Sequence, residues 1–545
     1  MAKYSLGLDY GTNSVRALLV NVGTGEEVAT SVFDFPSGES GILLDKRDPN
    51  LARQYPGDYI EGFYAVVGPV IAGVDPVDII GIGVDTTGSS PLPVHASGTP
   101  LGMLPAFRDD LAAQCWLWKD HTSHAEAAEI TSKAREMAMP YLAKCGGTYS
   151  SEWFWSKILH CARTSPHVFA AAHSWVECCD FVTGYLTSNQ TPEKMSRSVC
   201  AAGHKAMYNE GWGGYPSTEF LTALDPRLAE LRGTLNNVVA SDQLAGRLSA
   251  EVAQRSGLRE GTPVAVGAFD AHYGAVASGA RKGVLVKIIG TSTCDCMVHP
   301  LDEELADVPG LCGIVNGSIL PGYYGLEAGQ SAVGDIFNWF VSFCGQSHHE
   351  LTQGAAGLRP GQSGLLALDW NNGNRTVLVD PLLTGLLVGQ TLHTTPAEVY
   401  RALIEATAFG ALKIIRRLEE YGVAVDEVVN CGGIADKSPL VMQIYADVCN
   451  RPMKVSRSSQ TCALGSAIFG AVVGGAYKNA EEAQAKMVGF KDRIYTPDAG
   501  AAEVYSRLFR LYSDLHDAFG TREWDGNLAH VMKELIAIRE DARGS

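Results

Sequence analysis

A strand, a polar turn and a second strand begin the chain, and the same pattern returns in its second half. Residues 6–16 contain this unit around the pair Gly-Thr at positions 11–12. Residues 284–298 repeat it around the pair Gly-Thr at positions 290–291, again with an apolar segment on each side. Two such turns could hold one nucleoside triphosphate from opposite sides.

The first turn has the composition of a phosphate-binding turn. Gly11 allows the backbone to approach an anion closely, and Thr12, Asn13 and Ser14 offer short hydroxyl and amide donors. Asp9, at the end of the strand, could hold a hydrated divalent cation. The alternative is an ordinary hairpin connection, because Gly, Thr, Asn and Ser are common in turns that bind nothing. The turn alone leaves both interpretations open.

Length and composition restrict the class of protein. The chain has 545 residues, which favours more than one domain. Hydrophobic residues make up 46% and charged residues 19%, as in an ordinary globular enzyme. The formal net charge is −17 and no long basic run occurs, which argues against nucleic acid or an anionic membrane as a partner. A phosphorylated small molecule stays compatible, because backbone amides, a metal ion and a few local cations usually hold such ligands.

The cysteines and the apolar segments bear on location. The 13 cysteines form no CxxC pair, and the N-terminus leads into a strand without a secretory signal. Reduced thiols and a cytoplasmic location are therefore expected. The longest apolar run, residues 463–477, is shorter than the roughly 20 residues that span a bilayer. We expect it to form a buried helix.

Further strands follow the first hairpin. Residues 27–35 predict a third strand and hence a three-stranded meander. Residues 79–85 form an apolar strand that ends in Thr-Thr-Gly-Ser-Ser, a polar turn at the carboxyl end of a strand, where ligands often bind. Residues 262–269 predict another apolar strand, which ends in Asp270 and leads into a helix of small residues.

A basic and glycine segment at 281–283 predicts a hinge, which divides the chain into lobes at residues 1–280 and 281–545. In the second lobe, a capping box with proline at the first helical position starts a long helix at Thr395. The strand at 427–430 ends in Cys-Gly-Gly and enters a helix. The glycine pair permits a flat ligand near the backbone, although a plain strand-to-helix turn is the alternative.

Several common motifs are missing. No GxxxxGK[ST] loop occurs, which argues against a Walker-type nucleotide site. No GxGxxG follows a strand, which argues against a dinucleotide enzyme or a protein-kinase loop. No GxSxG elbow of an α/β-hydrolase is present.

Taken together, the motifs resemble those of the FGGY carbohydrate kinases in order and spacing, over nearly the whole chain. They are Gly-Leu-Asp-Tyr-Gly-Thr-Asn-Ser at 7–14, Gly-Ala-Phe-Asp at 267–270, Gly-Thr-Ser-Thr at 290–293, and Cys-Gly-Gly at 431–433 with Gln443 and Asp447. Within that family, further stretches are similar to the members that act on L-ribulose. These stretches are 84–89, 117–121, 149–155, 202–205 and 325–331.

The resemblance implies an α/β fold with two actin-like, RNase H-like lobes that bind a nucleotide and a sugar in the cleft between them. ATP and Mg²⁺ would be the cofactors, and a small sugar would be the partner. The oligomeric state stays open, with a homodimer as one option.

Asp270 is the candidate catalytic base, because partial desolvation after an apolar strand would raise its basicity and because it matches the family's catalytic aspartate. The alternative for Asp270 is a helix N-cap. Asp9 would hold Mg²⁺ through water. By resemblance, the residues that would contact ATP are Thr12, Asn13, Ser14, Arg16, Gly290, Thr291, Gly432 and Gly433. The candidate sugar-binding residues are Ser89, Trp118, Lys205, Asp270 and Glu327. For Trp118 the alternative is a core tryptophan, and for Lys205 and Glu327 it is a surface salt bridge.

The expected reaction is ATP-dependent phosphorylation of a ketopentose at its terminal 5-hydroxyl, with L-ribulose as substrate, in arabinose breakdown. One alternative is another sugar or polyol of the same family, such as D-ribulose, xylulose or ribitol. A second is an actin- or chaperone-like ATPase, which would not need sugar contacts or a base. A nuclease on the same fold is disfavoured by the negative charge.

Overall fold

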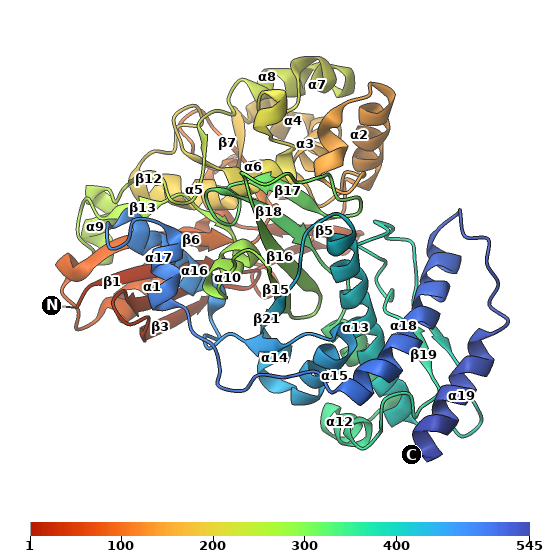
Figure 1. Ribbon diagram of the computed structural model, residues 1–545. Helices are drawn as coiled ribbons and strands as arrows, with labels where there is room; N and C mark the ends of the chain where they lie inside the picture. Colours follow the sequence, from red (N-terminus) through yellow and green to blue (C-terminus); the bar gives the residue numbers. More distant parts are fainter. Residues whose placement is uncertain (1, 545) are drawn as a thin grey trace.

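The computed structural model describes residues 2–544 and contains two large β-sheets, each with helices against it (Figure 1). No helix within this described part is both long enough and apolar enough to cross a membrane. The fold is mixed α/β, and the two sheets form the centres of two actin-like lobes.

The first sheet has the order β12-β13-β6-β1-β2-β3, with β14 also paired to β6. β1, β2 and β3 form the predicted antiparallel meander, and β6 joins β1 in parallel. The strands are β1 (Tyr4–Tyr10), β2 (Ser14–Asn21), β3 (Glu27–Asp34), β6 (Ile79–Thr86), β12 (Leu244–Arg247), β13 (Pro263–Ala265) and β14 (Ala268–Phe269).

The second sheet has the order β17-β18-β16-β15-β21-β22. It repeats the arrangement of the first, because β15 pairs antiparallel with β16 and parallel with β21. The strands are β15 (Val284–Ile289), β16 (Thr293–Pro300), β17 (Gly313–Asn316), β18 (Tyr323–Ala328), β21 (Glu427–Cys431) and β22 (Met453–Val455).

The strand predicted at residues 262–269 is interrupted. Val264 pairs with Ile82 and Ala268 pairs with Asp85, so this chain segment carries one residue more than β6 between the two pairs. An extra residue bends a strand and re-aims the side chains that follow it. Here the bend precedes Asp270, which begins the next helix.

Two helices from opposite halves of the chain pack between the sheets (Figure 1). They are α10 (Asp270–Ala277) and α16 (Thr461–Val473), and α16 is the buried helix expected from the apolar run. Their small residues allow close packing. A Cβ atom on Gly7 of β1 would lie 1.9 Å from the carbonyl oxygen of Ala463, so only glycine permits this approach.

Alternating strand residues supply both faces of each sheet. In β15, Val284 and Val286 pack with α10 and α16, whereas Leu285 packs with the helices on the far face. Those far-face helices include α13 (Pro396–Glu420), whose predicted capping box at Thr395 is present. In the first lobe, α1 (Pro56–Ile71) covers the far face.

The remaining elements surround these layers. The small strands are β4 (Leu43–Asp45), β5 (Asp48–Gln54), β7 (Pro91–Val94), β8 (Cys115–Trp116), β9 (Ser174–Glu177), β10 (Arg197–Ser198), β11 (Val238–Val239), β19 (Leu366–Leu368) and β20 (Leu386–Val388). The first-lobe helices are α2 (His124–Glu136), α3 (Phe154–Thr164), α4 (Pro166–Ala171), α5 (Cys178–Thr187), α6 (Val199–Ala206), α7 (Thr218–Leu224), α8 (Pro226–Arg232) and α9 (Ala250–Ser256). The later helices are α11 (Gly334–Cys344), α12 (His348–Ala356), α14 (Gly433–Lys437), α15 (Pro439–Cys449), α17 (Ala480–Met487), α18 (Ala499–Gly520) and α19 (Val531–Gly544).

Candidate active site

Two carboxylates lie side by side where β1 and β6 end. The parallel register pairs Asp9 directly with Asp85, so both side chains occupy the same face. Burial and the neighbouring Asp9 raise the pKa of Asp85 well above its ordinary value, although Ser466 donates to it at 2.7 Å. Burial also raises the pKa of Asp9, against the opposing effect of Arg16 at 3.6 Å. The pair therefore retains a proton more readily than isolated aspartates do.

Asp9 and Asp85 fit a hard cation. Their carboxylate oxygens and the Cys462 thiol lie within 4.8 Å of one another. Mg²⁺ prefers oxygen ligands, which the aspartates supply and a thiol does not. Burial raises the pKa of Cys462 well above its usual range, so the thiol stays protonated and is unsuited to binding metal. These two aspartates, with water, could hold the ion predicted at Asp9.

Asp270 is the first residue of α10, and Phe269 occupies the N-cap position. The Asp270 carboxylate accepts a hydrogen bond of 2.7 Å from the backbone N–H of Ala271. Burial, with the charge of Asp9, raises the pKa of Asp270 to about 7, while Lys205 lowers it. A carboxylate with this pKa can accept a proton near neutral pH.

The first polar turn is held by contacts from three segments. The Gly11 N–H donates to the Ser14 carbonyl at 2.9 Å. The Asn13 amide donates to the Ser40 carbonyl at 2.6 Å, so this donor is already engaged. The indole N–H of Trp118 donates to the Thr12 hydroxyl at 3.0 Å. Trp118 is half-buried and thus contacts the turn rather than lying in a closed core.

The second polar turn is more exposed. Gly290 and Thr291 are both exposed residues, and the Gly290 N–H donates to the Ser292 carbonyl at 2.9 Å. The segment before α11 fixes the turn, because the Val333 N–H donates to the Thr291 carbonyl at 2.8 Å. The Thr291 hydroxyl thus lies on an accessible surface.

The glycine pair after β21 has two different environments. Gly432 has a φ of +92°, and a Cβ atom there would lie 2.5 Å from the carbonyl oxygen of Ile289, so this glycine is needed for packing against β15. Gly433 has nothing within 4 Å of such a Cβ position. The space beside Gly433 could receive a ligand, whereas Gly432 shapes the backbone.

A charged pair joins the two lobes. Lys205, in the last turn of α6, lies 2.9 Å and 3.1 Å from the two carboxylate oxygens of Glu327 on β18. Burial acts to raise the pKa of Glu327, but Lys205, His204 and His272 outweigh it and hold the pKa far below its usual range. The Lys205 ammonium also lies 5.3 Å from the Trp153 ring centre. The pair is buried, so the alternative of a surface salt bridge is wrong.

The side chain of Ser89 is fully buried, and its hydroxyl donates to the carboxylate of Glu177. The Lys157 ammonium donates to the Ser89 carbonyl oxygen at 2.8 Å. The hydroxyl and the carbonyl of Ser89 thus already have protein partners, and its contact with sugar stays a prediction.

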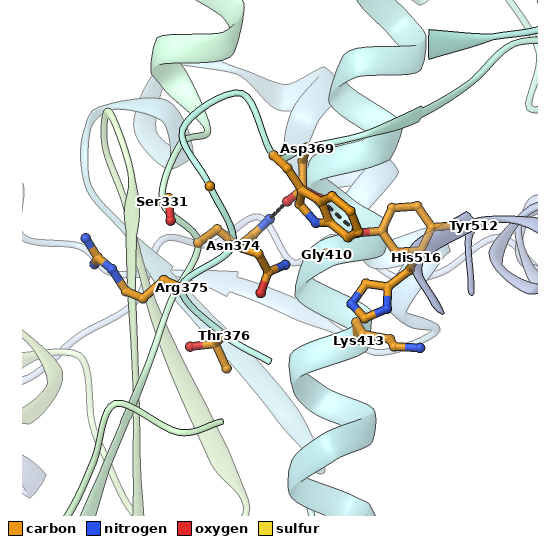
Figure 2. Close-up of a pocket in the computed structure, with 12 residues that line it drawn as sticks. Ser331, Asp369, Asn374, Arg375, Thr376, Gly410, Lys413, Tyr512 and His516 are labelled. Carbon is orange, nitrogen blue, oxygen red and sulfur yellow. Dashed lines mark hydrogen bonds between the residues drawn. The ribbon is translucent and has the colours of Figure 1, made fainter. Parts of the chain in front are cut away.

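Arg375 was not selected by the sequence motifs. Within residues 2–544 it makes no hydrogen bond or ion pair, and Figure 2 shows its side chain pointing away from Asp369, Tyr512 and His516. Burial acts to lower the pKa of Arg375, but Glu152, nearby thiols and Glu327 outweigh it. Arg375 thus offers an unpaired positive charge near the Glu327 carboxylate.

Asp85, His204, His272 and Cys462 were also missed as site residues. Asp85 could have been found, because the strand at residues 79–85 was predicted and its last residue is an acid beside β1. His204 lies in the stretch 202–205 that carries the family resemblance, whereas His272 and Cys462 come from helices distant in sequence and no motif marks them.

Comparison with known proteins identifies the family. The model of the FGGY family of carbohydrate kinases, N-terminal domain, matches residues 4–277, and the C-terminal domain model matches residues 285–474. The chain belongs to the FGGY family of carbohydrate kinases. It is therefore an ATP-dependent sugar kinase, and an actin- or chaperone-like ATPase and a nuclease are excluded as its function.

The relatives of this FGGY kinase include full-length matches. A ribulokinase of Geobacillus thermodenitrificans is 43% identical over 572 residues, covering 100% of this chain and 98% of the relative. A ribulokinase of Mycolicibacterium smegmatis is 38% identical, covering 99% and 97%. The solved structure of a xylulose kinase from Rhodospirillum rubrum has a TM-score of 0.79 at 23% identity, covering 95% of this chain and 99% of that one. This last likeness shows the fold alone.

Proposed function

We propose that this sugar kinase phosphorylates the terminal 5-hydroxyl of a ketopentose, with L-ribulose as its substrate, as a step of arabinose breakdown. The full-length relatives named ribulokinase support the substrate. The geometry supports the reaction through Asp270, whose pKa of about 7 suits a base. Besides burial, Asp9 and Glu327 raise the pKa of Asp270, and Lys205 lowers it. Asp270 therefore lies within electrostatic reach of both the proposed Mg²⁺ ligand Asp9 and the proposed sugar ligands Lys205 and Glu327.

In this reaction the Asp270 carboxylate accepts the proton of the 5-hydroxyl. The sugar oxygen bonds to the γ-phosphorus, the bond from that phosphorus to the bridging oxygen breaks, and ADP leaves. Mg²⁺, held through water by Asp9 with Asp85 beside it, would supply positive charge for the phosphates. Arg16 offsets further negative charge.

The remaining predicted residues divide between the two substrates. Thr12 and Ser14 from the first lobe and Thr291 from the second contact the phosphates, and the space beside Gly433 receives the adenosine. Lys205 and Glu327 bind sugar hydroxyls, and Trp118 forms a flat wall beside the first turn. Asn13 contributes through the backbone, because its side chain is engaged elsewhere.

We also propose that the lobes divide at residues 280 and 281 and that the enzyme works in the cytoplasm. All 13 cysteines are free, which suits a reducing compartment. α16 is the exception to a simple division, since it follows the second sheet in sequence but packs against the first.

The test measures ADP release with ATP and Mg²⁺ in the presence of L-ribulose, D-ribulose, D-xylulose, ribitol or no sugar. We expect the highest kcat/KM for L-ribulose and its loss in Asp270→Asn. Preference for another sugar would overturn the substrate and keep the family. ADP release that is independent of sugar and insensitive to Asp270→Asn would overturn the mechanism.

A further inference from the structure

Two histidines and a glutamate form a buried cluster at the junction of the lobes. His204 comes from α6, His272 from α10 and Glu327 from β18. The Nδ1 atom of His204 lies 3.3 Å from Oε2 of Glu327, and Nε2 of His272 lies 3.5 Å from the same oxygen. All three ligand atoms lie within 4.8 Å of one another.

Among the described residues, three histidine nitrogens in this cluster make no hydrogen bond, although two of them lie at ion-pair distance from the Glu327 carboxylate. Within residues 2–544, Nδ1 of His204 and both ring nitrogens of His272 make no hydrogen bond, although the two side chains are at most 2% exposed. A buried polar atom without a partner is unfavourable by about 1–3 kcal/mol. Such atoms, aimed at a carboxylate, indicate a ligand that is shared among them.

The tautomer of His204 follows from its other nitrogen. Nε2 of His204 lies 2.9 Å from the Ser318 hydroxyl, and this hydroxyl donates to the Val315 carbonyl at 3.2 Å. With the hydroxyl hydrogen directed to Val315, the tautomer that fits has Nε2–H of His204 as the donor, and in that tautomer Nδ1 carries a free lone pair. This arrangement, in which the outer nitrogen is fixed and the inner one is bare, is typical of histidines that bind metal.

The three side chains also have suitable ligand atoms. Two imidazoles and one carboxylate, whose ligand atoms lie within 4.8 Å of one another, make a donor set of the kind that binds Zn²⁺.

We propose that His204, His272 and Glu327 bind a divalent transition-metal ion of the Zn²⁺ class, and that this ion competes with the sugar for Glu327. The observed separations of 3.3 Å and 3.5 Å are near the ligand–ligand distance of about 3.3 Å in a tetrahedral site with bonds of about 2.0–2.1 Å. Mg²⁺ is not suited to the site, because it prefers oxygen ligands.

Lys205 contacts the Glu327 carboxylate, which the metal and the sugar would both need. Its ammonium lies 2.9 Å from Oε1 and 3.1 Å from Oε2 of Glu327, so a metal ion on Oε2 would displace the ammonium from that oxygen and leave it on Oε1. A sugar hydroxyl that needs the same carboxylate cannot bind at full strength while the ion is present. The competition rests on the proposed sugar-binding role of Glu327, whereas the binding of metal does not.

The test uses full-length protein freed of metal with a chelator and titrated with Co²⁺, whose visible absorption reports coordination, and then with Zn²⁺ to displace it. Wild type is compared with His272→Asn and His204→Gln. His299→Gln is the matched control, because His299 is also buried with an unpartnered Nε2 but lies outside the cluster. Circular dichroism confirms folding, and two cluster variants keep the test usable if one misfolds.

We expect one equivalent of Co²⁺ with four- or five-coordinate absorption and no thiolate charge-transfer band. Affinity should fall by more than about tenfold in each cluster variant and stay unchanged in His299→Gln. A thiolate band that Cys462→Ser removes, or wild-type affinity in both cluster variants, would overturn the site.

The proposed competition between metal and sugar is tested with the same proteins in the ADP-release assay. Zn²⁺ should raise KM for the sugar without lowering kcat in wild type, and this effect should shrink in His272→Asn. Zn²⁺ that binds at the cluster without changing KM would overturn the competition. Failure of the proposed function would look different, because wild type without Zn²⁺, assayed with ATP and Mg²⁺, would then not prefer L-ribulose.

Discussion

The two hairpins have the same backbone plan but carry different side chains. In the first, the last pair before the turn is Tyr10 with Val15, and the next pair is Asp9 with Arg16. In the second, the corresponding pairs are Ile289 with Thr293 and Ile288 with Cys294. The position that holds a partly buried ion pair in the first lobe is therefore uncharged in the second.

The second hairpin has its own ion pair, one step further from the turn. Lys287 lies 2.6 Å from Asp295, and both side chains are at most 1% exposed. A shift by one residue moves a side chain to the other face of a sheet. The same pairing of charges thus faces the cleft in one lobe and the interior in the other.

The central helices show the same difference. α10 begins with Asp270, whereas α16, which follows the last strand of the second sheet, begins with Thr461. At these matched positions, Asp9 and Asp270 are therefore acids of the first lobe without acidic counterparts in the second. We propose that the first lobe supplies the base and most of the phosphate contacts, and that the second lobe supplies Thr291 and Glu327.

The largest effect is expected for Asp270→Asn. An amide cannot accept the hydroxyl proton, so kcat should fall by about 10²–10⁴-fold. Thermal stability should be retained or increased, because the buried charge is removed. Steady-state kinetics and a melting curve on the same preparation measure both. A kcat within a few-fold of wild type would remove Asp270 from the chemistry.

Asp295→Asn tests the buried ion pair of the second hairpin. It leaves the Lys287 ammonium buried without a charged partner, which should lower the free energy of unfolding by about 3–5 kcal/mol. The kcat of the folded protein should stay near that of wild type. Urea denaturation and active-site titration separate the two quantities. A large loss of kcat at unchanged stability would contradict the assignment of a structural role.

A smaller effect is expected for Asp9→Asn. Because we propose that Asp9 holds Mg²⁺ through water, its loss should raise the Mg²⁺ concentration for half-maximal activity by about 10–100-fold. Ile288→Asn is the matched variant in the second hairpin and should leave the Mg²⁺ requirement unchanged. Equal shifts in both variants would show that the two hairpins do not differ in function.

The smallest effects compare the two turns directly. Thr12→Val removes a phosphate donor and the partner of the Trp118 indole, and KM for ATP should rise about tenfold. Thr291→Val removes only an exposed hydroxyl, so a rise of a few-fold is expected. If Thr291→Val raised KM for ATP more than Thr12→Val does, measured at saturating sugar, the second lobe would make the stronger phosphate contacts.

Much of the fold could be predicted from the sequence, because local patterns determine it. The alternation in residues 6–16 and 284–298 identified both hairpins, and the capping box at Thr395 identified the start of α13. The strand predicted at 262–269 was only partly right. Its extra residue depends on pairing with β6, which no local pattern contains.

Asp9 and Asp270 could be proposed from the sequence, because each follows a strand whose end is visible in the local pattern. The cluster of His204, His272 and Glu327 could not, since three segments meet there only in the folded chain. The contacts of Ser89 could not be predicted from its turn either, because its hydroxyl donates to Glu177, a residue distant in sequence.

The most direct test of a first-lobe base is the pH dependence of kcat/KM for the sugar, which reports groups of the free enzyme. The pKa of Asp270 is raised to about 7, and only its ionised form accepts a proton. We predict that kcat/KM is low in acid, rises with pH and is half-maximal near pH 7 in wild type and in Asp295→Asn. In Asp270→Asn this rise should be absent. A wild-type profile that is flat through pH 7, or one that Asp270→Asn leaves in place, would contradict the account.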